Sequence, residues 1–343
     1  MKTLKSQEIS QVFEKSLGIK VGSVKDIEGG MNNRLWKVID QKGKSYLLKK
    51  YVRDERDRLG HEYQGIKIMR DYGITSVPEA YWCDKEKLLA VYSFEGGIKK
   101  KPEELTSIEI VKMAGFLVKL KKISGGKETR NFPLSVNPCL SLNDYLKNIN
   151  SRLEGLNRNI VINNPRLLKY LRGVEIRPLF NQMIKKCLGS KTDSGKLYKK
   201  ISTSFLQLCP IDFGPHNMLI SKNGKICFLD FEYFGMDDPA RVLADFKWHE
   251  ISEKISDDKK KLFRTTYLTG IHATKDFVCH LNLVEKIAEI DWMSIYLGSV
   301  SPKKINTRRF CDKSFNEENY VVNQINKFYH RLDKYYDRNR KQN

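Results

Sequence analysis

The pattern of apolar and polar residues changes at Gly18, and the two sides of that point predict different elements. Before it, apolar residues at helical spacing predict an amphipathic helix over residues 1–17. After it, three segments alternate apolar and polar residues and are separated by Gly or Asn turns: Val24–Ile27, Leu35–Ile39 and Ser45–Tyr51. This period of two is typical of strands, so the three segments predict one antiparallel sheet.

One helix and two more strands complete a first, small lobe. Residues 55–72 carry apolar side chains at spacings of four, three and three, which predicts a helix. Strand-like segments follow at Ala80–Cys83 and Leu88–Phe94, and Gly96-Gly97 then interrupts the pattern. We therefore predict an N-terminal lobe over residues 1–96 that ends at a Gly-Gly hinge.

The rest of the chain, residues 97–343, is predicted to form a large and mostly helical lobe. Five segments have a helical apolar period: Leu105–Ile123, Leu140–Leu153, Pro178–Cys187, Asp258–Thr269 and Asn319–Asp337. A single hairpin interrupts them, because Asn223-Gly224 separates the short apolar runs Met218–Ile220 and Ile226–Leu229. The expected fold is α+β, with two lobes and the ligand cleft between them.

Three polar residues around the predicted hairpin have the arrangement that phosphoryl transfer requires. Asn217 lies five residues after Asp212 and directly before the hairpin, and Asp230 closes the second strand thirteen residues later. Transfer from ATP needs a carboxylate that orients or deprotonates the acceptor, and oxygen ligands for the Mg²⁺ that bridges the phosphates. Asp212 is the candidate for the first role, and Asn217 and Asp230 are the candidate metal ligands.

The letters Asp212-Phe213-Gly214 spell the magnesium-binding motif of protein kinases, but the spacing excludes that assignment. An aspartate in that role would have an Asn about thirteen residues upstream, with an Asp five residues before it. Those two positions hold Lys199 and Ser194. Asp230-Phe231-Glu232 has the correct spacing instead, so Asp230 is assigned to the metal.

The segment from Cys209 to Glu232 resembles the signature of the aminoglycoside phosphotransferase/choline kinase-like family, H-G-D-x-H-x-x-N, a hairpin, and I-D-x-E. The resemblance assigns the family's catalytic Asp to Asp212, its metal-binding Asn to Asn217 and its magnesium Asp to Asp230. It implies a protein-kinase-like fold in which ATP and Mg²⁺ are used to phosphorylate a small-molecule acceptor. Pro210-Ile211 departs from the pattern, because the family has His-Gly there.

The resemblance continues into the small lobe and assigns the nucleotide site. Gly29-Gly30-Met31-Asn32-Asn33 fits the family's nucleotide loop, with Gly29, Gly30 and Asn32 near the phosphates. Lys49, which shares a strand face with Leu47, corresponds to the phosphate-binding lysine. Glu62 on the following helix is its expected partner. The resemblance also implies that adenine is bound by the backbone at the end of the last strand, around Ser93, Phe94 and Glu95.

The resemblance covers roughly residues 20–250, and Gly235-Met-Asp-Asp-Pro239 followed by Asp245 loosely matches a stretch that braces the family's catalytic loop. Asp237-Asp238-Pro239 also has the pattern of a helix start. His216 is expected to pack or cap within the catalytic loop, since Asp212 already fills the role of base.

Composition limits the other possibilities. With 40% apolar and 10% aromatic residues the chain can bury a core, which excludes global disorder. No apolar run approaches the ~20 residues that span a bilayer, and the polar N-terminus lacks a signal-peptide pattern, so a cytoplasmic location is expected. Seven singly placed cysteines without C-x-x-C indicate reduced thiols.

The net charge of +21 raises the question of nucleic-acid binding. The basic residues, however, are spread along the whole chain in short clusters, and no nucleic-acid motif matches. General positive potential would still attract anionic ligands such as nucleotides.

The sequence favours an ATP-dependent kinase that phosphorylates a hydroxyl of a sugar, amino alcohol or aminoglycoside-like molecule. After Asp245 bases outnumber acids, which favours a neutral or anionic acceptor. One alternative is a catalytically inactive scaffold or binding protein, which would show gaps among the catalytic residues. The catalytic residues show no gap except the change at Pro210. Another alternative is a protein kinase, which would need an A-P-E segment and a long activation loop after Asp230. The sequence has no A-P-E segment there and no room for a long loop before Asp237-Asp238-Pro239.

Overall fold

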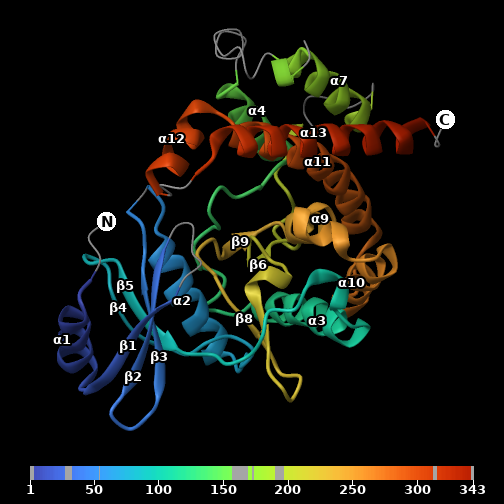
Figure 1. The fold of residues 1–343 in the computed structure, drawn as a ribbon. Coiled ribbons are helices and arrows are strands. Elements are labelled where there is room, and N and C mark those ends of the chain that lie inside the picture. The colour runs from blue at the N-terminus through green and yellow to red at the C-terminus, as the bar shows by residue number, and fades with distance from the viewer. Residues whose placement is uncertain are drawn as a thin grey trace. The chain divides into compact units, whose positions relative to one another are not determined.

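The computed structural model describes residues 4–27, 33–53, 55–156, 169–171, 174–189, 197–311 and 315–340 (Figure 1). The chain divides into two compact units. The first contains Met1–Pro138, Thr203–Val242 and Glu250–Thr274, and the second contains Cys139–Ser202, Leu243–His249 and Lys275–Asn343. The predicted lobe boundary at residue 96 does not coincide with this division, because the first unit also holds the predicted catalytic segment. That boundary stays a prediction.

The first unit contains a five-stranded antiparallel sheet with the order β1-β2-β3-β5-β4. Its strands are β1 (Val21–Ile27), β2 (Arg34–Asp40), β3 (Ser45–Lys50), β4 (Ala80–Asp84) and β5 (Leu89–Ser93). All five were predicted, the first three from alternation and the last two as strand-like segments. The sheet puts β3 between β2 and β5, so that Lys49 is paired with Leu35 on one side and Ala90 on the other.

Two helices cover opposite faces of this sheet, as Figure 1 shows. Helix α1 (Ser6–Leu17) buries Ile9 and Phe13 against a cluster that includes Tyr46 and Leu48 of β3. Lys49 points to the other face and contacts α2 (Arg58–Asp71). Because successive side chains of a strand alternate between faces, β3 presents Tyr46 and Leu48 to α1 and Lys49 to α2.

The remainder of the first unit is built around a short hairpin and two helices. The elements are α3 (Ser107–Ile123), β6 (Gln207–Cys209), β7 (Met218–Ile220), β8 (Ile226–Phe228), β9 (Gly235–Asp237) and α10 (Asp257–Gly270), with the 3₁₀ helices η1 (Pro102–Glu104), η2 (Pro215–Asn217) and η3 (Glu250–Lys254). β7 and β8 form the predicted hairpin, and β6 pairs with β9. Phe116 of α3 stacks on Phe213 and Phe228 at centroid distances of 5.8 and 4.3 Å, which packs α3 against the hairpin.

The hinge segment is fixed to the hairpin by backbone hydrogen bonds. Ile98 and Ile220 exchange two of them, each with a nitrogen–oxygen distance of 3.0 Å. Gly97 has φ of 149°, and a β-carbon there would lie 2.9 Å from the carbonyl oxygen of Ile220. Only glycine fits this close approach without a shift of the backbone.

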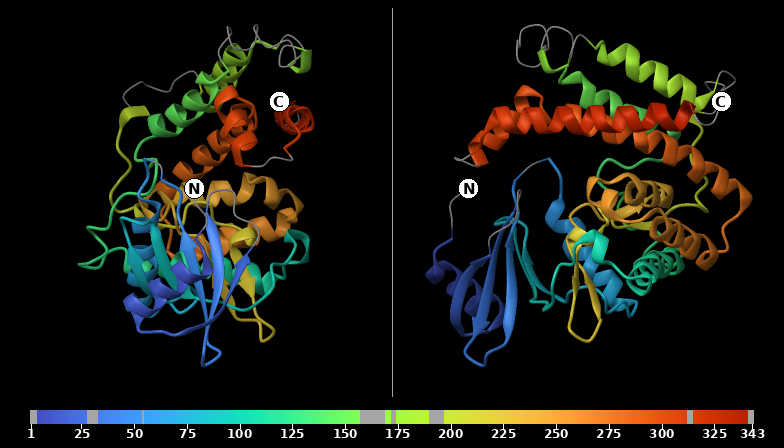
Figure 2. Two further views of the ribbon diagram at one scale, coloured as in Figure 1. Left: turned by 60° about the vertical axis from the view of Figure 1, so that its left-hand side comes forward. Right: turned by 45° about the vertical axis from the view of Figure 1, so that its right-hand side comes forward.

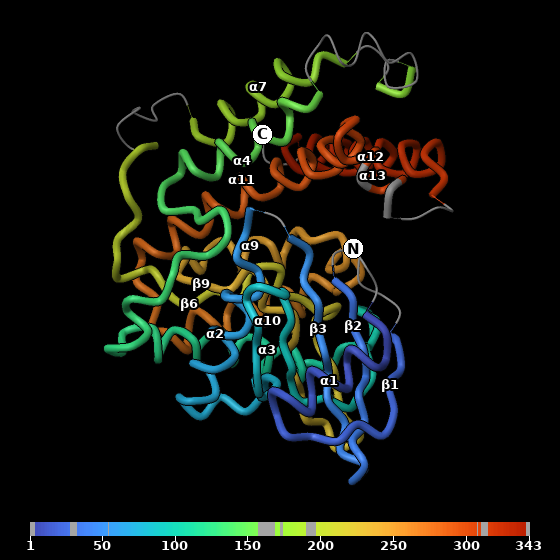
Figure 3. Tube along the Cα trace, turned by 90° about the vertical axis from the view of Figure 1, so that its left-hand side faces the viewer, coloured from blue at the N-terminus to red at the C-terminus, as the bar shows by residue number. Residues whose placement is uncertain are grey.

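The second unit is helical in its described residues, and Figures 2 and 3 show its helices gathered side by side. They are α4 (Leu142–Glu154), α7 (Ile176–Leu188), α11 (Lys275–Ser299), α12 (Pro302–Cys311) and α13 (Glu317–Arg340). Helix α11 is the centre, since it packs against α4, α7, α12 and α13. Helix α9 (Pro239–Trp248) begins in the first unit and ends in the second. Across the described part of the chain, every helix is too short or too polar to cross a membrane.

Candidate active site

Lys49 connects three segments that lie far apart in the sequence. Its Nζ is 2.6 Å from Oε2 of Glu62 on α2 and 2.8 Å from Oδ1 of Asp230, which follows β8. Lys49 and Glu62 are 5% and 4% exposed, whereas the Asp230 side chain is 39% exposed. The buried pair therefore presents its charge to a carboxylate that reaches solvent.

The electrostatics of this group keep the lysine protonated. Burial alone would lower the pKa of Lys49, but the negative charges of Glu62, Asp230 and Glu232 outweigh it and raise the pKa above its usual value. Burial raises the pKa of Glu62, and Lys49 opposes that shift. A permanently charged ammonium beside a partly exposed carboxylate is suited to bind phosphate oxygens.

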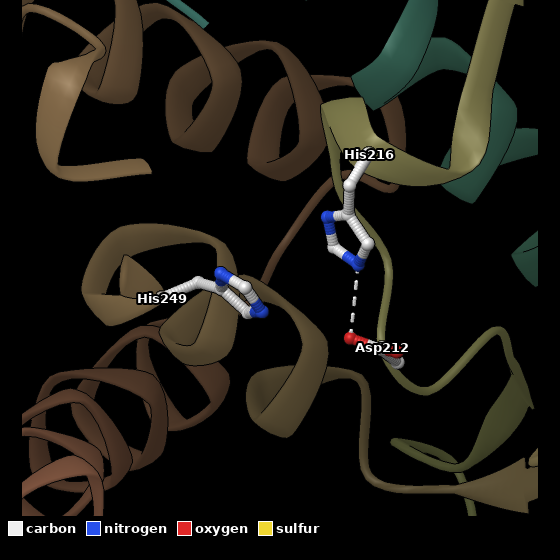
Figure 4. A group of neighbouring side chains, drawn as sticks. All are labelled: Asp212, His216 and His249. Atoms are coloured by element: carbon white, nitrogen blue, oxygen red, sulfur yellow. Dashed lines mark hydrogen bonds and ion pairs between the residues drawn. The ribbon is translucent and has the colours of Figure 1, made fainter. Parts of the chain in front are cut away.

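Asp212 lies in a tight loop that orders its side chain and that of Asn217. Nδ2 of Asn217 donates to the carbonyl oxygen of Asp212 at 3.0 Å, and Nε2 of His216 lies 3.1 Å from Asp212 Oδ1 (Figure 4). His249, which Figure 4 also draws, belongs to the second unit. The Asp212 side chain is 44% exposed, so it can reach a bound molecule. The backbone N–H of Leu229 donates to Asn217 O at 2.9 Å, which ties this loop to the residue before Asp230.

Asp212 and Asp230 share an uncommon backbone conformation. Their φ angles are 69° and 62°, in the left-handed region that most residues other than glycine avoid. Aspartate is among the few that enter it, and such residues concentrate at functional sites. The predicted catalytic Asp212 and the predicted metal ligand Asp230 therefore lie outside the strands, each in a left-handed backbone conformation.

The residues near Asp230 fit a magnesium ion by their chemistry. Mg²⁺ prefers oxygen ligands, usually one or two carboxylates together with water and substrate phosphates. Asp230 supplies a partly exposed carboxylate, and Asn217 uses its amide nitrogen as a donor to Asp212, which leaves its amide oxygen as the atom available to accept. This donor set suits a metal that is completed by the phosphates of a nucleotide.

The strand before the Asp212 loop pairs with a strand that ends in a buried aspartate. Asp237 is fully buried, and its Oδ2 accepts hydrogen bonds from Ser135 Oγ at 2.5 Å and Arg241 at 2.7 Å. Its strand pairs with β6, where Gly235 lies opposite Cys209. The strand that leads into the loop through Pro210 is thus held by β9, although the histidine of the family signature is missing.

A second buried ion pair lies two residues beyond Asp230. Glu232 and Arg58 are each 4% exposed and paired with one another, and Glu232 Oε2 also accepts from Asn33 Nδ2 at 2.8 Å. Asn33 is the last residue of the predicted nucleotide loop, and Arg58 begins α2. Glu232 therefore anchors both the end of that loop and the helix that carries Glu62 to the Asp230 segment.

The predicted adenine-binding segment runs from β5 toward the hinge. The N–H of Ser93 donates to Glu79 O at 2.9 Å, and its hydroxyl bonds to the Glu95 carboxylate. Phe94 is half-buried, with Lys37 Nζ 4.4 Å from its ring centroid. A cavity of about 690 Å³ lies farther along and includes none of the predicted site residues in its lining: Gly96, Gly97, Ile98, Lys100, Glu109, Ile220, Ser221, Lys222 and Gly224.

The structure brings some predicted residues together and leaves others untested. Lys49, Glu62 and Asp230 are in direct contact, and Asp212 contacts Asn217. Their roles in binding and catalysis stay predictions. The predicted loop residues Gly29, Gly30 and Asn32 lie outside the described residues.

Sequence reasoning missed the contacts of Arg58 and Asn33 with Glu232, which is 174 and 199 positions away. It also missed Tyr51 as a contact of Glu62. The one available signal for Tyr51 was its place two residues after Lys49, at the end of the same strand.

The fold is protein-kinase-like. Its features are the five-stranded sheet with α2, the Lys49–Glu62 pair, and the Asp212–Asn217 loop directly before the β7–β8 hairpin. No protein-family model matches this sequence, and no curated protein sequence matches it. Solved structures do match. Spectinomycin phosphotransferase in complex with ADP and spectinomycin is similar with a TM-score of 0.64 and 13% identity, over 95% of this chain and 99% of that one.

Two further solved structures have the same fold. Choline kinase from Cryptosporidium parvum matches with a TM-score of 0.63 and 17% identity, over 98% of this chain and 97% of that one. Ethanolamine kinase from Plasmodium vivax matches with a TM-score of 0.58 and 16% identity, over 94% and 87% of the two chains. These matches confirm the predicted protein-kinase-like α+β fold of aminoglycoside phosphotransferases and choline kinases.

Proposed function

We propose that this protein is an ATP-dependent kinase that transfers the γ-phosphate to a hydroxyl group of a small molecule. The observation that carries the proposal is the contact of Lys49 with both Glu62 and Asp230. A buried glutamate that holds a lysine beside a metal-binding aspartate is the arrangement that positions nucleotide phosphates in kinases. The three residues come from β3, α2 and the end of the hairpin, so local sequence alone does not create their contact.

Each residue has a defined task in this proposal. Lys49 binds the α- and β-phosphates, and Asn217 and Asp230 hold Mg²⁺, which supplies charge neutralisation when bound. Asp212 orients the acceptor hydroxyl and takes its proton, for which its partly exposed carboxylate and the turn that projects it are suited. Backbone groups around Ser93–Glu95 would bind adenine.

The solved structures support the donor. Spectinomycin phosphotransferase was crystallised with ADP, and another similar structure, at 14% identity and a TM-score of 0.60, is a ternary complex with streptomycin and ATP. Acceptors differ among these proteins, from aminoglycosides to choline and ethanolamine. They therefore leave the acceptor of this chain open.

The charges of the second unit favour a neutral or anionic acceptor over a polycation. Three of its acids are already paired with the chain's own bases: Asp291 with Arg152, Glu285 with Lys247 and Glu289 with Arg338. A cationic acceptor needs carboxylates that are not already neutralised. We therefore place sugars and related alcohols ahead of aminoglycosides.

The proposal is tested by ADP release. Purified protein with ATP and Mg²⁺ is offered a panel of sugars, amino alcohols and aminoglycosides, and ATP binding is measured separately by calorimetry. Acceptor-dependent ADP release is expected, with the highest kcat/KM for a neutral or anionic acceptor. ATP binding without release for any acceptor would favour an inactive binding protein, and no ATP binding would exclude the kinase.

A further inference from the structure

A buried tyrosine shares the glutamate oxygen that Lys49 uses. Tyr51 follows Lys49 by two residues, is 1% exposed, and its hydroxyl donates to Glu62 Oε2 at 2.7 Å. Lys49 Nζ lies 2.6 Å from the same oxygen. The Tyr51 ring is also close to the ammonium, with 5.0 Å between Lys49 Nζ and the ring centroid. Tyr51 therefore contacts both members of the ion pair.

A second tyrosine determines the direction of the hydrogen bonds. The hydroxyl oxygens of Tyr51 and Tyr92 are 2.8 Å apart, and Tyr92 is also 1% exposed. The Glu62 carboxylate has no hydrogen to give, so the single hydrogen of Tyr51 goes to Glu62. Tyr92 must then donate to Tyr51. Burial raises the pKa of both hydroxyls well above the usual value, so both remain protonated donors at neutral pH.

We propose that Tyr51 is a positioning residue that holds Glu62, and through it Lys49, for nucleotide binding, with Tyr92 as its support. The role rests on the proposed function, because Lys49 must bind phosphates for it to matter. When the ammonium shares its charge with phosphate oxygens, its bond to Glu62 weakens. Glu62 is 4% exposed and cannot turn to water, so a buried donor must keep its position.

The hydroxyl has the position that this role requires. It approaches Glu62 from the residue that directly follows β3, the strand that carries Lys49, whereas Glu62 itself is on α2. The hydrogen bond thus fixes the distance between the end of β3 and α2, and this distance determines the position of Lys49 Nζ. Among the described residues, the other side chain that holds the Glu62 carboxylate is Lys49, the residue whose position Glu62 is meant to set.

The substitution Tyr51→Phe tests the role, because it keeps the ring over Lys49 and removes only the hydroxyl. We expect ATP affinity measured by calorimetry to fall about tenfold, the scale of a hydrogen bond to a charged group. KM for ATP should rise by a similar factor, while kcat at saturating ATP changes less than threefold. Tyr92→Phe leaves the donor to Glu62 in place and should weaken ATP binding about threefold.

Tyr267→Phe is the matched control. Tyr267 is a fully buried tyrosine of the same unit, and its hydroxyl donates to Gln207 Oε1 at 2.7 Å. The Tyr267→Phe variant should lose stability as Tyr51→Phe does, and its ATP affinity should stay within twofold of the wild-type value. An unchanged ATP affinity in Tyr51→Phe, or an equal loss in Tyr267→Phe, would overturn the role. If Tyr51→Phe does not fold, unchanged affinity in Tyr92→Phe would do so.

The wild-type protein separates this inference from the function on which it rests. ATP binding by the wild type that is insensitive to Tyr51→Phe removes the positioning role and leaves the kinase standing. A wild type that does not bind ATP removes both.

Discussion

The two units use buried charge in different ways. In the first unit, the buried Lys49–Glu62 pair ends on Asp230, whose side chain is 39% exposed. In the second, Arg331 is 3% exposed, donates to the Trp248 carbonyl oxygen, and lies 5.8 and 5.5 Å from the ring centroids of Trp292 and Tyr296. The first pair therefore contacts a carboxylate that is exposed to solvent, whereas Arg331 contacts residues in helices of its own unit. The Lys49–Glu62 pair is therefore expected to serve binding, and Arg331 is expected to serve stability.

The largest expected effect is on turnover and comes from the first unit. Asp212→Asn removes the carboxylate but keeps a residue that tolerates a φ of 69°. We expect kcat to fall by about 10²–10⁴, the usual contribution of a positioned acid or base. ADP release with the best acceptor of the panel measures it.

Stability and ATP affinity serve as controls for that variant. ATP affinity should stay near the wild-type value, because Asp212 is not among the groups proposed to bind the nucleotide. Stability should also stay near that value, because the Asp212 side chain is 44% exposed. Turnover within tenfold of the wild type would show that Asp212 is not the catalytic base.

The second effect is on stability and comes from the second unit. Arg331→Met leaves the Trp248 carbonyl oxygen without this donor and removes the cation from two aromatic faces. We expect the free energy of unfolding to fall by about 2–4 kcal/mol. Urea denaturation measures it, and ATP affinity should not change.

Lys334→Met on the same helix is the matched control, since Lys334 is exposed and its replacement should alter stability by less than about 0.5 kcal/mol. A tenfold loss of ATP affinity in Arg331→Met, without loss of stability, would contradict the division between the two units.

The smallest expected effect on turnover comes from alkylation of the cysteines. The rate at which a buried cysteine is alkylated reports the opening of the unit in which it lies. Burial raises the pKa of Cys227 in the first unit to about 12 and that of Cys187 in the second to about 11, whereas Cys279 is exposed. A higher pKa means less thiolate at pH 8, and the thiolate is the form that reacts. Alkylation should therefore modify Cys279 first without loss of activity.

Pulsed alkylation with mass spectrometry then follows the two units. Arg331→Met should speed the modification of Cys187 and leave Cys227 protected. Equal acceleration at both cysteines would mean that the units unfold as one and would blur the comparison.

The sheet and the hairpin could be predicted from sequence because their signals are local. Alternation placed β1, β2 and β3, strand-like apolar segments placed β4 and β5, and Asn223-Gly224 placed the turn between β7 and β8. Strands β6 and β9 have three residues each, too few for a period of two to be visible. Helix α11 was missed because it is covered by other helices on several sides, so its apolar residues form no single stripe.

The candidate site was predicted only as far as its residues follow a known order along the chain. Asp212, Asn217 and Asp230 follow that order, and Lys49 and Glu62 were placed by resemblance. Contacts between distant segments, such as Arg58 with Glu232, leave no trace in local pattern. The contacts of Asp237 are likewise invisible in local pattern. The sequence suggested Asp237-Asp238-Pro239 as a helix start, and the structure bears this out, since the N–H of Ala240 at the start of α9 donates to Asp238 Oδ1 at 2.9 Å. The structure adds that the buried Asp237 carboxylate accepts a hydrogen bond from Ser135 Oγ.

The left-handed backbone at Asp212 and Asp230 limits which residues can replace them. The φ angles of 69° and 62° are reached by glycine, asparagine and aspartate, whereas a β-branched residue would be strained at either position. Glycine would fit the backbone, but at Asp230 it would remove a carboxylate that pairs with the buried Lys49, and at Asp212 one that contacts His216. Backbone conformation and side-chain pairing therefore restrict both positions independently of any role in phosphoryl transfer.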